Sequence, residues 1–355
     1  MSASQASRIR TAIAGVGNCA SSLVQAVSYC RAKGADAIGV SFPVLGGYTP
    51  QDIEIVAGFD IDRRKVNRPI GEAVLADQPA RVYRGPDLDG VSNFMRNQPP
   101  EVSFVPSDEP PLSRDQVVAA LREAEAEVLI IFLPVGSAQA VEFYAECALE
   151  AGCAVVNGIP VFLASNPAWA KRFADAGLPI IGDDFKAQFG ATVVHRTLAH
   201  LADLRGVKID RTYQLNVGGN TDFMNMMDMD RLALKRESKT EAVQTAMDSR
   251  LADGDIRIGP SDYVPWLHDR KVAYVRLEGR LLGGARTSIE MRLEVEDSPN
   301  AAAMALSAIR LARIARSRGL SGAVPEASAF LFKHPPVQMD DPEAHDALLA
   351  FADAK

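Results

Sequence analysis

The sequence predicts an α/β fold class, in which a Rossmann-like doubly wound parallel sheet is joined to a second α+β domain with a largely antiparallel sheet. Three observations lead to this prediction. Strand-like and helix-like segments alternate through the first half of the chain, as they do in βα units. Residues 127–135 (EVLIIFLPV) are an unbroken apolar run, typical of a strand buried on both faces of a parallel sheet. Residues 287–297 (TSIEMRLEVED) instead alternate apolar and charged side chains, as half-buried antiparallel strands do.

The first half of the chain supplies the strands and helices of the parallel sheet. We expect strands at 10–15, 53–60, 127–135, 153–157 and 178–184, and helices at 18–33, 114–125, 137–150 and 169–177. The stretch 34–50 is rich in Gly and Pro, so we expect it to be an inserted loop.

After about residue 205 the pattern changes, which indicates a second domain. Residues 272–282 are a suitable antiparallel partner for 287–297. We expect residues 8–190 together with 301–355 to form the first domain, and 191–300 to form the second. Helices at 301–318 and 341–353 would return to the first domain. The apolar face of the second sheet would be covered by helices at 222–233 and 239–251 or by a symmetric partner.

Composition excludes several classes of protein. The length of 355 residues suggests roughly two domains, at about 150 residues each. An apolar fraction of 47% excludes a mainly disordered chain, and no apolar run is long enough for a membrane helix. The net charge of −7 argues against a general nucleic-acid binder. No secretory signal precedes residue 10, and the scattered cysteines favour a reduced, cytoplasmic compartment. The histidines have no zinc-hydrolase spacing.

A glycine-rich turn follows the first predicted strand and opens the first predicted helix. Gly15 and Gly17 occupy the first two positions of a dinucleotide-binding fingerprint, and Ala20 takes the third. The helix N-terminus would then offer backbone N–H groups to a pyrophosphate. The residues predicted to bind the cofactor here are Gly15, Gly17, Asn18, Cys19, Ala20 and Ser21.

Other strand ends extend this predicted cofactor site. Asp60 ends the second strand, where a carboxylate accepts hydrogen bonds from ribose hydroxyls and repels a 2′-phosphate, so NAD is favoured over NADP. A simple turn aspartate is the alternative. Pro134, Gly136 and Asn157 follow two later strands at the same edge of the sheet, where α/β proteins bind ligands.

Charged and amide side chains gather in several later segments. In Gly182–Lys186 (GDDFK), two adjacent carboxylates beside a lysine could hold a cation or share a proton, although Asp184 could also cap a helix. Lys235 and Lys239 would share one helix face, where like charges lower the pKa of one amine; a solvated face is the alternative. The pattern fits a site that binds phosphate and moves protons at carbon.

Ten landmark segments follow one another along the chain: VGNCASSLVQ, FDID, LPVGS, NGIPVF, GDDFK, QLNVGGNTDF, LKRESK, DRKVAYVRLEGR, EDSPN and FLFKHPP. Taken together, they resemble the myo-inositol-1-phosphate synthase (inositol-3-phosphate synthase) family in its short actinobacterial and archaeal form. The resemblance covers about residues 9–335. Except for Lys208, every lysine between residues 205 and 340 lies on one of these landmarks.

The resemblance implies a redox-neutral isomerase that cyclises D-glucose 6-phosphate to 1L-myo-inositol 1-phosphate (1D-myo-inositol 3-phosphate). In this reaction NAD oxidises C5, C6 is deprotonated, the C6 enolate attacks the C1 aldehyde, and the C5 ketone is reduced again. The family also implies a homotetramer built through the second sheet. A divalent cation is a further candidate cofactor, with Asp184 and Asp297 as its ligands.

The resemblance also implies roles for individual residues. Lys235 would transfer the proton at the C5 hydroxyl, and Lys271 would assist the aldol step near C5 and C1. Lys239 and Lys333 would bind substrate oxygens. Four aspartates would orient the lysines and the nicotinamide: Asp184, Asp222, Asp269 and Asp297. Asn216 and Asn220 would bind substrate hydroxyl or phosphate groups.

Two departures from the family pattern leave other substrates open. Ala187 stands where many relatives carry Ser, and His334 stands where a small residue is more usual. A paralogous NAD-dependent cyclase acting on another sugar phosphate, such as a ketose phosphate, is therefore an alternative. A net-redox dehydrogenase and a non-catalytic NAD-binding protein are further alternatives.

Overall fold

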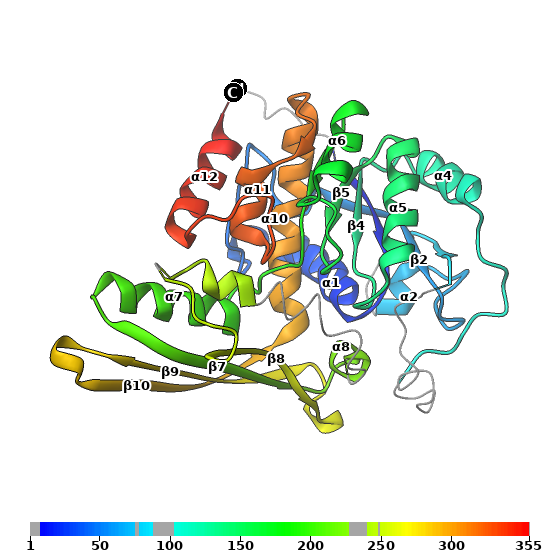
Figure 1. Ribbon diagram of the computed structural model, residues 1–355. Helices are drawn as coiled ribbons and strands as arrows, with labels where there is room; N and C mark the ends of the chain where they lie inside the picture. Colours follow the sequence, from blue (N-terminus) through cyan, green and yellow to red (C-terminus); the bar gives the residue numbers. More distant parts are fainter. Residues whose placement is uncertain (1–7, 75–77, 88–102, 227–239, 248, 355) are drawn as a thin grey trace.

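The computed structural model describes residues 8–74, 78–87, 103–226, 240–247 and 249–354, and within them the chain forms two sheets (Figure 1). The first sheet has seven parallel strands in the order β11-β6-β5-β4-β1-β2-β3. Its strands are β1 (Ile9–Ala14), β2 (Ile53–Asp60), β3 (Val82–Arg84), β4 (Val128–Ile131), β5 (Ala154–Asn157), β6 (Pro179–Ile181) and β11 (Gly322–Ala323). The predicted doubly wound parallel sheet is confirmed.

Helices cover both faces of the parallel sheet. One face carries α1 (Asn18–Lys33), α2 (Ile70–Val74), α10 (Asp297–Ser317), α11 (Pro325–Leu331) and α12 (Asp341–Asp353). The other face carries α4 (Arg114–Glu123), α5 (Ala138–Ala151) and α6 (Pro167–Asp175). The bounds predicted for α1 and β2 agree with the structure. None of the described helices is long and apolar enough to cross a membrane.

Several strands are shorter than predicted or were not predicted. β4 ends at Ile131 rather than 135, because its last pairing is with Asn157 of β5 and Pro134 beyond it has no N–H to donate. β6 ends at Ile181, before the GDDFK segment. The strands β3, β7, β8 and β11 were not predicted separately.

The second sheet is mixed and lies below the first in Figure 1. Its order is β10-β9-β7-β8, and its strands are β7 (Lys208–Gly218), β8 (Ile256–Tyr263), β9 (Arg270–Arg280) and β10 (Arg286–Glu296). β9 pairs antiparallel with β10, as the alternating pattern predicts, and it also pairs antiparallel with β7. β7 and β8 pair parallel, which was not predicted.

One face of the second sheet packs against α7 (Ala191–Leu204) and the residues after Thr240. Where a helix is predicted at 222–233, the structure has the short helix α8 (Thr221–Asn225), which ends with Met226 as its C-cap. Residues 227–239 lie outside the described part. The helix predicted at 239–251 ends at Gln244, because the Gln244 side chain bonds both backbone groups of Leu251 and closes a loop. The predicted domain boundaries stay a prediction.

The inserted loop at 34–50 lies against α10 and is held by a buried arginine. Arg310 donates hydrogen bonds to the backbone oxygens of Phe42 (2.7 Å) and Leu306 (2.8 Å). The loop includes a short 3₁₀ turn, Gly34–Asp36, and a second 3₁₀ turn, Pro50–Asp52, leads into β2. None of the residues 34–50 lines the cavity described below.

A buried polar chain crosses the inner face of the second sheet. His195 of α7 lies with Nε2 2.7 Å from Thr212 Oγ1 and Nδ1 3.3 Å from Gln214 Oε1. The Gln214 amide donates in turn to Asn216 Oδ1 at 3.0 Å. Burial lowers the pKa of His195 from 6.5 to about 4, so the imidazole is neutral at pH 7.

We expect His195 to make the fold acid-sensitive between pH 6.5 and 4. In that window the unfolded chain binds a proton at this histidine that the folded chain does not bind, so the free energy of unfolding falls as pH falls, by up to about 3 kcal/mol. Urea unfolding at several pH values should show a smaller acid loss for His195→Gln than for the wild type. Equal pH slopes for the two proteins would contradict this assignment.

Candidate active site

A cavity of about 480 Å³ opens where the carboxyl ends of the parallel strands face the second sheet. Its wall is built from both sheets and from the first residues of α8 and α10. The predicted site residues that line it are Gly15, Gly17, Asn18, Cys19, Asp60, Pro134, Asp184, Asn220, Asp222, Lys271, Asp297 and Lys333. The chain therefore brings residues more than 300 positions apart into one site, as the landmark pattern predicts.

The glycine turn lies between β1 and α1, as the fingerprint predicts. Gly15 has φ +92°, and a Cβ there would lie 2.7 Å from the backbone oxygen of Phe132, so only glycine fits. A Cβ at Gly17 would meet nothing within 4 Å, which leaves open space in front of the helix. No side chain caps the N-terminus of α1. This end of the cavity fits a pyrophosphate held by backbone N–H groups.

Other predicted cofactor residues are placed beside the cavity rather than on its wall. Ala20 is fully buried in the core, and Ser21 lines an adjoining groove. Gly136 has φ +91° and lies in the turn after β4. Asn157 is buried beneath the cavity, where its amide donates to Asp183 Oδ1 at 2.7 Å. Their predicted contacts with the cofactor stay predictions.

Asp60 lies at the cavity wall, but protein donors already surround its carboxylate. Oδ1 accepts from the backbone N–H groups of Ile61 (2.7 Å) and Asp62 (2.9 Å). Oδ2 accepts from Val16 N at 2.9 Å and lies 3.4 Å from Lys65 Nζ. Lys65 also donates to the Val16 oxygen at 2.6 Å. Lys65 thus ties the glycine turn to Asp60, a role that the sequence analysis missed.

The two adjacent carboxylates of GDDFK have separate environments. Asp183 is fully buried and accepts hydrogen bonds from Leu163 N, Ala164 N and Ser165 N, at 3.0 to 3.1 Å. Burial raises the pKa of Asp183, and hydrogen bonds from Ser165, Asn157 and Ala164 oppose that shift. Asp184 instead faces the cavity and pairs with Lys333 at 2.7 Å. The structure therefore contradicts the idea that the two carboxylates share a proton or a cation.

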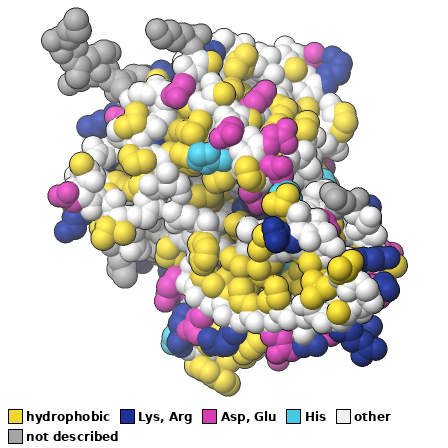
Figure 2. All heavy atoms as spheres, turned by 90° about the vertical axis from the view of Figure 1, so that its left-hand side faces the viewer, with side chains coloured by type: hydrophobic (Ala, Val, Ile, Leu, Met, Phe, Trp, Pro, Cys, Tyr) yellow, Lys and Arg dark blue, Asp and Glu magenta, His cyan; other side chains and the backbone are white. Residues whose placement is uncertain are grey.

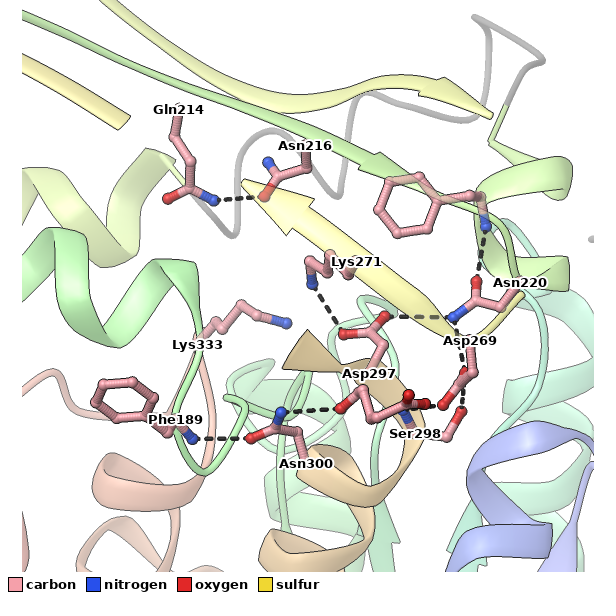
Figure 3. A network of polar contacts seen from close by, with 12 residues as sticks. Phe189, Gln214, Asn216, Asn220, Asp269, Lys271, Asp297, Ser298, Asn300 and Lys333 are labelled. Atoms are coloured by element: carbon pink, nitrogen blue, oxygen red, sulfur yellow. Dashed lines mark hydrogen bonds and ion pairs between the residues drawn. The ribbon is translucent and has the colours of Figure 1, made fainter. Parts of the chain in front are cut away.

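A second ion pair and its hydrogen bonds form the opposite wall (Figure 3). Lys271 Nζ of β9 lies 3.0 Å from Asp297 Oδ1 at the start of α10. The Asn220 amide lies 3.4 Å from Asp297 Oδ2 and 3.3 Å from Asp269 Oδ1. Asp269 also accepts from the Ser298 N–H (2.9 Å) and hydroxyl (2.6 Å), so it holds the first turn of α10. Ser298 lies in the EDSPN landmark but was not predicted as a site residue.

Three other predicted site residues, Asn216, Lys235 and Lys239, are not among the described residues that line the cavity. Asn216 is fully buried and donates to the Gly259 oxygen at 2.8 Å, so it lies behind the wall rather than on it. Figure 3 shows Gln214 and Asn216 on the same strand, above Lys271. Lys235 and Lys239 lie outside the described residues. Their predicted roles stay predictions.

The two residues that depart from the family pattern, Ala187 and His334, lie in different surroundings. Ala187 lines the cavity, and its methyl group offers no hydrogen bond. His334 does not line it; the ring stacks on Phe162 with centroids 3.9 Å apart. Only Ala187 is therefore placed to contact a ligand directly.

The arrangement is suited to reactions that develop negative charge on oxygen. Two lysine ammonium groups face one cavity, and each is held by an aspartate. Such preorganised positive charge stabilises oxyanions and phosphate groups. Among the described residues we find no group of three or more His, Cys, Asp or Glu side chains placed to hold a metal ion.

Comparisons with known proteins agree with this geometry. Residues 190–298 match the family model described as myo-inositol-1-phosphate synthase. Proteins named inositol-3-phosphate synthase from Mycolicibacterium smegmatis and Corynebacterium glutamicum are each 48% identical, over 98% and 97% of this chain and 98% of each relative. A crystal structure of Ari2 is 35% identical with a TM-score of 0.75, covering 98% of this chain and 100% of Ari2. The inositol-3-phosphate synthase of Caenorhabditis elegans shares the fold at 16% identity, with a TM-score of 0.73 over 98% of this chain and 86% of that chain.

We expect Asp183→Asn and Asp184→Asn to have different effects on stability. Asp183→Asn replaces a buried acceptor with an amide that faces N–H donors, so the free energy of unfolding should fall by about 3 kcal/mol. Asp184→Asn should cost about 1 kcal/mol, because asparagine tolerates the φ of +61° and Lys333 remains at the cavity wall. Urea unfolding measures both losses. Similar losses would contradict the separate roles.

Proposed function

The chain belongs to the inositol-3-phosphate synthase family, and on this premise we propose how its residues divide the reaction. The enzyme is an isomerase that converts D-glucose 6-phosphate to an inositol phosphate. The observation that carries the proposal is the placement of Lys271 and Lys333, each paired with an aspartate, in the same cavity as the Gly15–Gly17 turn. We propose that the product is 1L-myo-inositol 1-phosphate, which is the same compound as 1D-myo-inositol 3-phosphate.

The glycine turn and the strand ends beside it would hold NAD. Gly15, Gly17, Asn18 and Cys19 would face the pyrophosphate, and Asp60 with Lys65 would lie beside the adenosine ribose. The open space in front of Gly17 supports this assignment. When bound, NAD supplies reversible oxidation at C5 of the sugar.

Lys271 would stabilise the negative charge that develops on the substrate oxygens during the aldol step. Its ammonium group lies 3.0 Å from Asp297 Oδ1, which orients it. Lys333, held by Asp184, would bind the phosphate or the C1 oxygen. Asn220 lies on the same wall and would bind a substrate hydroxyl or phosphate group, and Asp222 near it would orient the lysines and the nicotinamide. Lys235 would transfer the proton at the C5 hydroxyl. Lys239 would bind a substrate oxygen.

A divalent cation at Asp184 and Asp297 stays a prediction. Each of these carboxylates already holds a lysine ammonium group, at 2.7 Å and 3.0 Å. The two lysines would therefore supply the positive charge that stabilises the substrate oxygens.

We also propose that the protein is a homotetramer built through the second sheet. Figure 2 shows hydrophobic side chains gathered over the lower part of one face, where that sheet lies. β10 is its edge strand, and Ile289 on that strand is 45% exposed. Leu204 of α7 and Leu282 at the β9–β10 turn (Leu282–Gly284) are also exposed. A large exposed apolar surface favours association.

The domain division belongs to the same proposal. Residues 8–190 and 301–355 would bind NAD, and residues 191–300 would carry the catalytic lysines and the subunit contacts. The scattered cysteines support a cytoplasmic location.

The reaction is tested by incubating the protein with a catalytic amount of NAD and a sugar phosphate, with the product assigned by NMR. We expect glucose 6-phosphate to give myo-inositol 1-phosphate without net NADH, because the oxidation and reduction cancel. Accumulated NADH would indicate a net-redox dehydrogenase. Turnover of fructose 6-phosphate in place of glucose 6-phosphate would indicate the alternative ketose phosphate cyclase, and Ala187 would be the first position to revert.

The role of Lys271 is tested by Lys271→Met. We expect kcat to fall by about a hundredfold or more, because one preorganised cation is lost from the cavity. Lys208→Met is the matched control, since Lys208 is exposed on β7 and does not line the cavity. Steady-state product formation measures both variants. Equal activities would contradict the assignment.

A further inference from the structure

Three charged side chains meet behind the cavity and are not used by the proposed function. Lys186 and Arg196 are buried, with 1% and 2% of their surface exposed. Asp341 lies between them at the start of α12. Its Oδ1 is 3.1 Å from Lys186 Nζ, and its Oδ2 is 3.3 Å from Arg196 Nε. One carboxylate therefore holds two buried cations.

The same side chains bind the backbone of several separate segments. Lys186 donates to the Ala329 oxygen of α11 at 2.7 Å. Arg196 of α7 donates to the Ala242 and Met339 oxygens, both at 2.9 Å. The cluster thus joins α7 and residue 242, which pack on the second sheet, to α11 and α12, which cover the first.

Lys186 also belongs to the segment that carries a cavity ion pair. Backbone hydrogen bonds join residues 183–186 to 331–334: Lys186 N donates to the Leu331 oxygen at 2.8 Å, and Lys333 N donates to the Asp184 oxygen at 2.7 Å. The rings of Phe185, from the first stretch, and Phe332, from the second, stack on each other with centroids 4.5 Å apart. Asp184 and Lys333 line the cavity from this paired segment, and Lys186 anchors it from behind.

The charge balance explains why Asp341 is needed. Two cations share one anion, and burial lowers the pKa of Lys186 to about 8, with Arg196 adding to that shift and Asp341 opposing it. Without the carboxylate, both cations would be buried with no ion-pair partner among the described residues, which is strongly unfavourable. We then expect one of two outcomes. Either Lys186 loses its proton, or residues 183–186 and 331–334 move so that its ammonium group reaches solvent.

We propose that Asp341 is a positioning residue of the reaction, which acts through Lys186 and Arg196 to hold the Asp184–Lys333 pair at the cavity. This inference rests on the proposed function. Asp341 touches neither the cavity nor the glycine turn, so it should affect turnover rather than cofactor binding.

The neighbouring aspartate provides a matched control. Asp340 caps α12 by accepting from Glu343 N at 2.7 Å, and no described contact joins it to Lys186 or Arg196. Asp340→Asn and Asp341→Asn therefore remove the same charge at the same helix end, but only the second removes the anion of the cluster. Asp341→Glu keeps that anion.

The test compares these variants in the full-length protein, with glucose 6-phosphate, NAD, product analysis and thermal unfolding. We expect Asp341→Asn to lower kcat at least tenfold, with NAD affinity within about twofold of the wild type. Asp341→Glu should recover part of the loss, and Asp340→Asn should keep nearly full activity. Comparable kcat values for Asp341→Asn and Asp340→Asn would overturn the inference.

A second variant tests the inference if Asp341→Asn fails to fold. Lys186→Met leaves Asp341 paired with Arg196 alone, one anion with one cation, and removes the anchor, so it should fold and still lose turnover. Full activity in this variant would overturn the inference. Absence of inositol phosphate from the wild type would overturn the proposed function itself, and the positioning role with it.

Discussion

The site depends most on one ion pair, between Lys271 of β9 and Asp297 at the start of α10. Asp297 directly follows the last residue of β10 and begins the helix that covers one face of the parallel sheet. Asp297, which pairs with Lys271, therefore also lies at the connection between the second sheet and the helix that packs on the first. Because the two side chains are only 18% and 20% exposed, their attraction is screened less than at an open surface. Asn220, Asp269 and Ser298 complete the hydrogen bonds around it.

The second ion pair, Asp184 with Lys333, follows the same principle from the other side of the cavity. In both pairs a carboxylate orients an ammonium group in a partly closed space, where an oxyanion gains most from it. The pairs are carried by rigid elements, a strand and a helix start in one case and a paired segment in the other. The buried cluster of Lys186, Arg196 and Asp341 supports the second pair from behind.

Sequence patterns predicted the elements and their order well, because period and glycine placement are local signals. They predicted less about side-chain direction. Asp183 and Asp184 are adjacent, yet one closes a loop and the other faces the cavity, because the chain turns at Asp184 with φ +61°. Asn157 and Asn216 are predicted to bind ligands, and in the structure their amides donate to Asp183 and to the Gly259 oxygen. Their contacts with ligands stay predictions. Lys65 was missed because its role depends on the distance between Val16 and Asp60, which only the folded chain defines.

In the proposed reaction, C5 of the sugar is oxidised and then reduced again in the same cavity, while the lysines stabilise negative charge on oxygen. The decisive measurement uses glucose 6-phosphate carrying deuterium at C5, with catalytic NAD and product analysis by NMR and mass spectrometry. We expect the deuterium to stay on the same carbon in the inositol phosphate. Deuterium lost to solvent, or found in released NADH, would contradict the proposed reaction.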